Sequence, residues 1–148
     1  DLKSANNVTH RFVLLYQIIE LLMGDAIIKD IDKIYSRLQN GKISTNDYFA
    51  ETSRVSKEKE RIRNIFNSCN LQSADCEKFR ESCKELFVNS GFNSETTSND
   101  SDMFYNFRNK MMHSYSRLYA HRDLMSKTIQ SFEQIVLLII EKYPRLIG

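Results

Sequence analysis

The chain has 148 residues, of which 41% are hydrophobic and 27% are charged, so it is long enough and apolar enough to fold as one domain around a core. Its 21 Lys and Arg residues against 19 Asp and Glu residues leave a net charge of only +2. That balance argues against a protein that coats DNA through bulk charge, but it allows a small RNA-binding cleft. Because one proline and four glycines leave long stretches without a helix breaker, we predict a single all-helical domain over residues 1–148.

The first predicted helix begins near Asn7 and ends either at Met23 or, if the pattern continues, at Leu38. After Leu38, the run Gln39-Asn40-Gly41 is a typical helix stop signal. Residues 12–22 are apolar around most of the helix circumference. We therefore expect this helix to be the central one of the domain, or to lie partly in a dimer interface.

Two more helices are expected between residues 44 and 89. The second starts with a capping residue at 44–45 and runs to about Cys69. It includes the charged run 57–61, whose alternating signs predict a solvated face. The third is capped by Ser73 and runs to about Asn89.

The one clear long loop, rich in Ser, Asn and Thr, is predicted at residues 89–102. The next helix begins at Ser101 or Asp102 and weakens between residues 114 and 122. A strongly amphipathic last helix then runs from about residue 123 to 143, where the chain's one proline stops it.

Three cysteines, Cys69, Cys76 and Cys83, follow one another at steps of seven without the close pairs that zinc sites use. We expect reduced thiols packed in the core, no metal or cofactor, and a cytoplasmic location. The longest apolar runs, such as residues 135–140, are too short to span a bilayer, and no signal-peptide pattern is present. Because the chain begins with Asp1, we expect the C-terminal part of a longer protein or a processed form.

The run Phe-Arg-Asn-Lys-Met-Met-His at residues 107–113 is the most informative part of the sequence. Four apolar residues around it recur at helical steps and predict a core-facing stripe: Phe104, Phe107, Met111 and Leu118. Asn109 and His113 fall on the opposite side, four residues apart, and Arg117 and His121 continue the same row. His113 is therefore expected to point away from the core.

Arg108, Asn109 and His113 suffice for metal-free cleavage of RNA. An imidazole can move a proton at neutral pH, and a guanidinium can stabilise the extra charge of a five-coordinate phosphate. In a straight helix, however, Arg108 and His113 diverge by about 140°. Either Arg108 reaches around from a frayed helix start, or a second copy of the motif completes the site across a dimer interface.

The pattern Arg108-Asn109, three residues, His113 resembles the signature of HEPN domains, many of which are ribonucleases. The stretch Tyr16-Gln17-Ile18-Ile19-Glu20 is similar to the first helix of the ApeA-like HEPN group. Many relatives have glycine directly after the histidine, whereas Ser114 stands here. The resemblance implies a HEPN-like bundle of about five helices that forms a homodimer with a composite cleft.

The resemblance also implies a function: a metal-independent endoribonuclease that leaves 2′,3′-cyclic phosphate and 5′-hydroxyl ends, in a defence or toxin–antitoxin context. Its partners would be RNA, a second copy, and an antitoxin or an N-terminal sensor domain. Arg108, Asn109 and His113 would be catalytic. Tyr16 would support them, and Glu20 is either a partly solvated residue or a carboxylate that orients a motif side chain.

The remaining candidates for substrate contacts are basic residues that follow the motif arginine: Lys110, Arg117, His121 and Arg122. Two other interpretations stay open. In one, a HEPN-like bundle no longer cleaves RNA and instead dimerises or binds a nucleotide or a partner. In the other, the chain is a generic helical scaffold, Arg108 forms a structural salt bridge to an acid such as Glu20, and His113 has no role.

Overall fold

A computed structural model describes residues 2–92 and 99–143, with side chains from Asn7 onward. Within these residues the chain is entirely helical, as predicted. Its seven α-helices and one short 3₁₀ helix are α1 (Leu2–Gln39), α2 (Thr45–Val55), α3 (Glu58–Ser68), η1 (Ser73–Cys76), α4 (Glu77–Asn89), α5 (Asp100–His113), α6 (Tyr115–Tyr119) and α7 (Arg122–Lys142). None of the helices in the described part of the chain is both long and apolar enough to cross a membrane.

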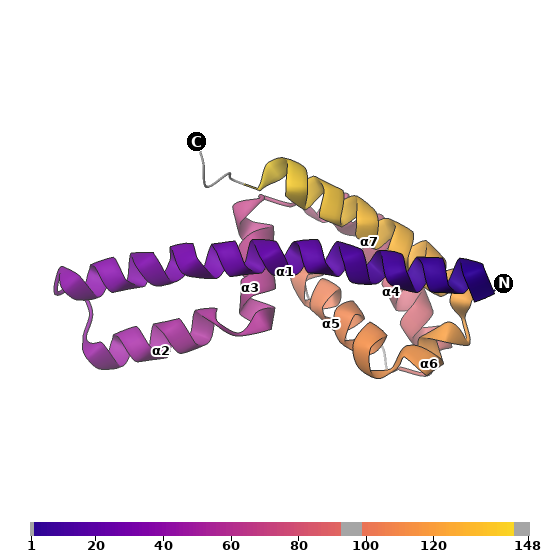
Figure 1. Cartoon of the computed structure of the whole chain (residues 1–148), viewed down its shortest axis with the longest axis horizontal. Helices are drawn as coiled ribbons and strands as arrows, with labels where there is room; N and C mark the ends of the chain where they lie inside the picture. Colours follow the sequence, from indigo (N-terminus) through magenta and orange to yellow (C-terminus); the bar gives the residue numbers. More distant parts are fainter. Residues whose placement is uncertain (1, 93–98, 144–148) are drawn as a thin grey trace.

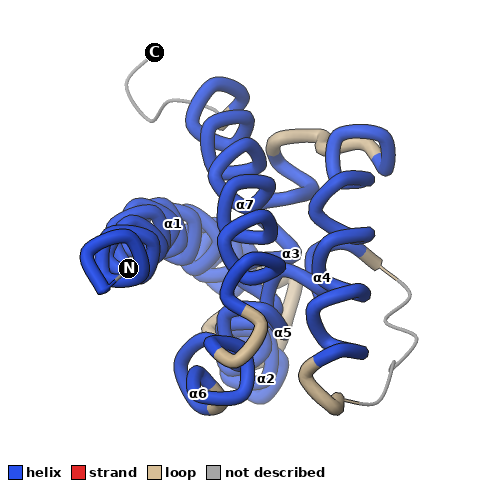
Figure 2. The backbone as a smooth tube through the Cα atoms, turned by 90° about the vertical axis from the view of Figure 1, so that its right-hand side faces the viewer, coloured by secondary structure: helices blue, strands red, loops and turns tan. Residues whose placement is uncertain are grey.

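Helix α1 is the longest element and extends along the whole molecule (Figure 1). Its N-terminal half contacts α7, while α2 returns along its C-terminal half as a helical hairpin that projects from the bundle. Viewed from the end, α7 lies between α1 and α4, with α5 and α6 below it (Figure 2). The helices therefore form two parts: a bundle, and a projecting hairpin made of α2 and the C-terminal half of α1.

Five phenylalanines form the centre of the bundle, and each is at most 2% exposed: Phe12, Phe79, Phe104, Phe107 and Phe132. They come from α1, α4, α5 and α7, so they join elements that are far apart in sequence. Phe132 is the shared neighbour, with its ring centroid 4.5 Å from that of Phe104 and 5.2 Å from that of Phe12. The four apolar residues predicted to face the core around the motif are all buried, but only three of them lie on α5, since Leu118 belongs to α6.

The single helix predicted over residues 45–69 was wrong, because the chain breaks between α2 and α3. Ser56 ends α2 with its N–H bonded to the Thr52 carbonyl, and Lys57 is extended at φ −68° and ψ 134°. The turn lets α2 pack on α1 while α3 contacts both α1 and α5. A straight continuation would carry the buried face of α3, including Ile62 and Ile65, away from the core.

Other boundaries differ by smaller amounts. The first helix continues without a break to Gln39, and a short helix, α6, forms where the pattern indicated weakness. These changes, with the α2–α3 break, explain why seven helices replace the five expected. Residues 93–98 of the predicted loop, and the proline expected to stop α7, lie outside the described residues. The three cysteines are free and buried, and burial raises the pKa of Cys76 to about 12.

Candidate functional site

The motif helix α5 begins at a cap that the sequence pattern placed two or three residues too late. Asn99, rather than Ser101 or Asp102, is the N-cap residue, and its side-chain oxygen accepts a hydrogen bond of 2.8 Å from the Asp102 N–H. The Ser101 hydroxyl donates to the same Asn99 oxygen at 2.9 Å. An amide cap satisfies an N–H that would otherwise lack a partner at the helix start.

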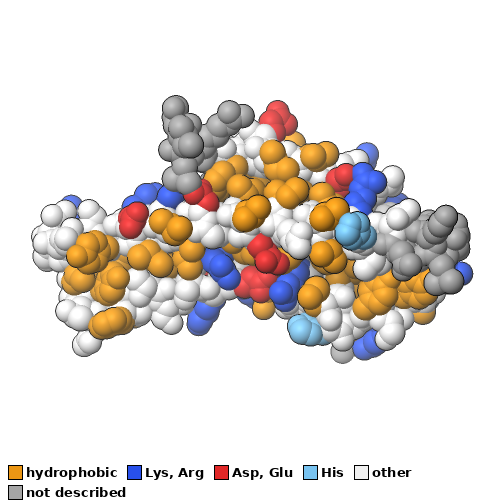
Figure 3. Space-filling view, viewed as in Figure 1, with side chains coloured by type: hydrophobic (Ala, Val, Ile, Leu, Met, Phe, Trp, Pro, Cys, Tyr) orange, Lys and Arg blue, Asp and Glu red, His pale blue; other side chains and the backbone are white. Residues whose placement is uncertain are grey.

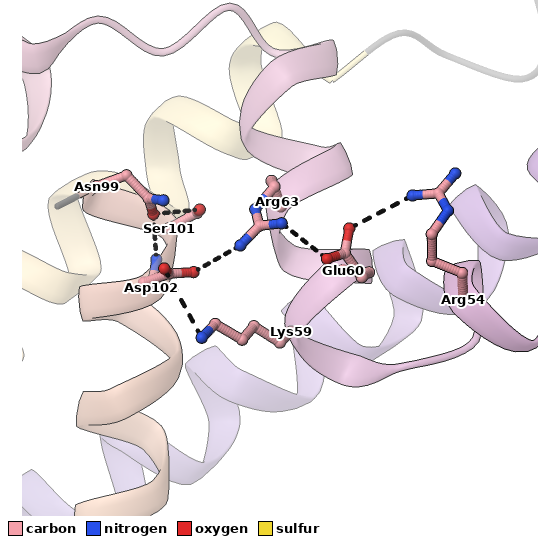
Figure 4. Close-up of polar contacts among 7 residues, drawn as sticks. All are labelled: Arg54, Lys59, Glu60, Arg63, Asn99, Ser101 and Asp102. Carbon is pink, nitrogen blue, oxygen red and sulfur yellow. Dashed lines mark hydrogen bonds and ion pairs between the residues drawn. The ribbon is translucent and has the colours of Figure 1, made fainter. Parts of the chain in front are cut away.

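A network of charges ties the start of α5 to α3 (Figure 4). The Asp102 carboxylate lies 3.2 Å from Arg63 and 3.7 Å from Lys59, and Arg63 also pairs with Glu60 at 2.7 Å. Glu60 in turn lies 3.6 Å from Arg54 of α2. These contacts connect the N-terminal end of α5 to α3.

Arg108 lies in the middle of α5 and forms a cluster with α1 and α3. Its Nε lies 3.3 Å from Glu58 Oε1, and its guanidinium carbon lies 5.4 Å from the centroid of the Tyr16 ring. Its Nη1 donates to Asn109 Oδ1 at 3.1 Å, and the Tyr16 hydroxyl donates to Glu58. We call Tyr16, Glu58, Arg108 and Asn109 the arginine cluster.

The Arg108–Glu58 contact is an ion pair without a hydrogen bond at Nε, because Nε is buried and has no acceptor in suitable geometry. Both side chains are about one quarter exposed, at 22% for Arg108 and 24% for Glu58. The guanidinium is therefore oriented by its neighbours while part of its surface faces solvent. Such an arginine can bind a phosphate oxygen without a large rearrangement.

Burial and the hydrogen bond to Glu58 raise the pKa of Tyr16 well above its ordinary value of 10.0. Tyr16 therefore keeps its proton at neutral pH and acts as a donor to Glu58. It is not a base in this arrangement. Its contact with Arg108 is through the ring face, which favours a cation.

The raised pKa predicts a loss of stability in alkali. Below pH 10, Tyr16 is protonated in both the folded and the unfolded states and contributes no pH dependence. Above that pH only the unfolded state ionises, so the free energy of unfolding falls by up to about 1.4 kcal/mol per pH unit. We expect Tyr16→Phe to have a shallower fall between pH 9.5 and 11 in urea titrations. If the free energy of unfolding of the parent falls with pH no more steeply than that of Tyr16→Phe, the buried hydrogen bond between Tyr16 and Glu58 is contradicted.

Glu58 is the residue of the arginine cluster that sequence reasoning missed. The charged run at 57–61 was predicted to be a solvated face, which is wrong for Glu58 and Glu60 since both are half-buried and ion-paired. Glu20 is exposed, and the carboxylate paired with Arg108 is that of Glu58. No local pattern connects Glu58 with a helix fifty residues later.

His113 is the last residue of α5 and is exposed. Among the residues that the structure describes, no hydrogen bond or ion pair holds its side chain. Arg108 contacts Tyr16, Glu58 and Asn109, and His113 is not part of that cluster. Since Arg108 lies mid-helix, it does not reach His113 from a frayed helix start. Completion of the site by a second copy stays a prediction.

The basic residues after the motif do not continue one row. Helix α5 ends at His113, and Arg117 turns to the segment that follows α4, where its Nη2 donates to the Gly91 carbonyl at 2.9 Å. Its guanidinium carbon lies 4.0 Å from the centroid of Phe92, and Lys110 Nζ lies 4.3 Å from the same ring. The predicted four-residue row is wrong beyond His113 because the helix on which it depended stops there.

His121 and Arg122 lie at the start of α7, where the Arg122 guanidinium carbon is 5.8 Å from the centroid of Tyr119. Arg122 is exposed and His121 is half-buried. The structure therefore brings Arg108 together with Asn109 and Tyr16, and brings Lys110 together with Arg117. It leaves His113 outside both groups. No group of three or more His, Cys, Asp or Glu side chains that could hold a metal ion occurs in residues 2–92 and 99–143.

The fold and the site define an all-helical bundle with a buried aromatic core and a partly exposed arginine cluster at its surface. Comparisons with models of protein families, with curated proteins and with solved structures found no match.

Proposed function

We propose that the protein is a metal-independent endoribonuclease of HEPN-like type, and that Arg108, Asn109 and His113 are its catalytic residues. The observation that carries the proposal is the arrangement of α5. An arginine oriented by its neighbours lies on the same helix that ends in an exposed histidine. The sequence resemblance to the HEPN signature supports the same assignment.

In the proposed reaction the 2′-hydroxyl oxygen of one ribose attacks the adjacent phosphorus. His113 takes the 2′-hydroxyl proton as general base or gives a proton to the leaving 5′-oxygen as general acid. Arg108 stabilises the negative charge of the phosphorane, and Asn109 orients Arg108 through their hydrogen bond. The O2′–P bond forms and the P–O5′ bond breaks, which gives a 2′,3′-cyclic phosphate and a 5′-hydroxyl.

Because Arg108 and His113 diverge in one chain, we propose that Arg108 of one copy and His113 of another act on one phosphate. Glu20 and Tyr16 remain proposed supporting residues, Tyr16 through its contacts with Arg108 and Glu58. A role in defence or in a toxin–antitoxin pair, with an antitoxin or a sensor domain as partner, follows from the resemblance alone. We place the protein in the cytoplasm, where reducing conditions suit its three free thiols.

A DNA oligonucleotide with a single ribonucleotide tests this chemistry directly. We expect cleavage only on the 3′ side of the ribonucleotide, with a cyclic phosphate on the upstream product. The same oligonucleotide with a 2′-O-methyl group at that position should not be cut, because the attacking nucleophile is blocked. Cleavage of the methylated strand would contradict the mechanism.

The ion pair with Glu58 predicts a measurable effect on RNA binding. Glu58→Gln removes a negative charge beside Arg108, so we expect RNA affinity at low salt to rise by up to about fivefold, the range of a partly exposed charge pair. Glu60→Gln is the matched control, since Glu60 pairs with Arg54 and Arg63 rather than with Arg108. If Glu58→Gln and Glu60→Gln change RNA affinity equally, Arg108 is not part of the RNA-binding site.

The same ion pair favours a second candidate, a HEPN-like module that binds a nucleotide or a partner without cleaving RNA. In that case Arg108 and Asn109 form the binding surface and His113 is dispensable. Binding of RNA or nucleotide should then survive His113→Ala without change, and no cyclic phosphate should form with the parent protein.

A further inference from the structure

Exposed hydrophobic side chains follow α1 at steps of seven residues. Leu14, Leu21, Ile28 and Tyr35 are 47%, 76%, 63% and 48% exposed, and we call them the α1 row. Hydrophobic side chains extend along α1 on the face shown in Figure 3. Single exposed apolar residues are ordinary, but seven-residue steps keep a whole set on one helix face, which is the pattern of a helix that packs against another helix.

Gly24 lies three residues after Leu21 and therefore close to the same face of α1. A Cβ atom at Gly24 would meet no heavy atom within 4 Å, so packing among the described residues does not require a glycine there. Glycine inside a helix costs about 0.5–1 kcal/mol relative to alanine. A second helix that approaches α1 closely at this point would account for the missing side chain.

We propose that α1 pairs antiparallel with α1 of a second copy, across a two-fold axis near residues 22–23. In this register Leu21 packs on the partner's Gly24, and by symmetry its own Gly24 receives the partner's Leu21. Leu14 packs against the partner's Ile31. Leu21, the most exposed side chain of the α1 row, thus meets the glycine of α1, which has no side chain, as expected for an isologous interface.

A second copy suits this surface because the two-fold axis brings Leu21 of each copy against Gly24 of the other. From Leu14 to Tyr35, the row extends about 32 Å at 1.5 Å per residue, which is about three heptads of antiparallel packing. A contact of this length lies at the low end of specific interfaces, below about 1,200 Å² in total. We therefore expect association in the micromolar range.

The α1 row lies apart from the arginine cluster. Tyr16, which contacts Glu58 and Arg108, is buried against the bundle, whereas the residues of the α1 row are exposed. The pairing goes beyond the proposed function and does not depend on it.

Light scattering at tens of micromolar tests the pairing. The mass of one chain is 17.4 kDa, so the parent should be a dimer of about twice that mass. Leu21→Glu should weaken association at least about tenfold, because each interface would bury two unpaired carboxylates. The control is Val88→Glu, which changes an apolar residue of α4 that is 58% exposed and should remain dimeric. Unchanged helical circular dichroism would show that both variants fold.

Disulfide trapping tests the register. A mixture of Leu21→Cys and Gly24→Cys should form a linked dimer on a non-reducing gel, while each variant alone should not. The natural cysteines are buried and should give little background. A monomeric parent, a dimer unaffected by Leu21→Glu, or linkage of Leu21→Cys to itself would overturn the pairing. RNA cleavage by a monomer would overturn both the α1 contact and the site shared between two copies, but not the ribonuclease activity itself. A trapped dimer that never cuts RNA would overturn only the ribonuclease.

Discussion

A mixture of Arg108→Ala and His113→Ala is expected to recover about one quarter of the parent's RNA cleavage, although each variant alone should lose about 10²–10⁴-fold. In one chain Arg108 contacts α1 and α3, while His113 is exposed at the end of α5. If Arg108 of one copy acts with His113 of the other, a mixed dimer contains one intact site. About half of the dimers are mixed after exchange, and each has one intact site of two.

The experiment requires incubation at high concentration for subunit exchange, followed by single-turnover cleavage of a labelled RNA. A mixture of His113→Ala with the double variant is the control, because none of its sites can be complete. Activity that stays at the level of the single variants after exchange would mean that both side chains act from one chain. The RNA would then have to bridge Arg108 and His113 of the same helix.

The largest effect on stability is expected at Phe132. Its ring is fully buried and contacts four other phenylalanines from α1, α4 and α5. Phe132→Ala should lower the free energy of unfolding by about 3–5 kcal/mol through lost burial and the cavity left behind. For a domain of this size that corresponds to a fall in Tm of about 6–20 °C.

Urea unfolding followed by circular dichroism measures this loss. Leu137→Ala is the matched control, because it removes an apolar side chain from the same helix at a position that is 56% exposed. It should change the free energy of unfolding by no more than about 0.5 kcal/mol. A Phe132→Ala variant within 1 kcal/mol of the parent would mean that the aromatic cluster is not the centre of the core.

Helical periodicity was sufficient to predict the main elements of this fold. The stripe around the motif, the amphipathic last helix and the apolar first helix each repeat at steps that only a helix places on one face. The break at Ser56 and Lys57 was not predictable in this way, since neither residue is a strong helix breaker. It arises because α2 follows the projecting half of α1 whereas α3 must reach α5.

In the site, too, contacts between neighbours in the sequence were predictable, whereas contacts made by the packing of distant helices were not. The spacing of Arg108 and His113 predicts that one helix does not direct both side chains to the same point, and in the structure His113 makes none of the contacts that hold Arg108. The carboxylate beside Arg108 could not be found from the sequence, because Glu58 reaches it through the packing of α3 on α5. Arg117 was misplaced for a similar reason, since the carbonyl groups that hold it, those of Ser90 and Gly91, follow α4.

The most direct test of the ribonuclease proposal is cleavage of a mixed-sequence RNA in EDTA by the parent and by His113→Ala prepared identically. Because His113 is exposed, its loss should leave stability unchanged within about 0.5 kcal/mol. We expect the parent to cut and to leave 2′,3′-cyclic phosphate ends, and the variant to lose at least about 100-fold in rate. Equal cutting by both proteins, or cutting that stops in EDTA, would contradict a metal-independent site that contains His113.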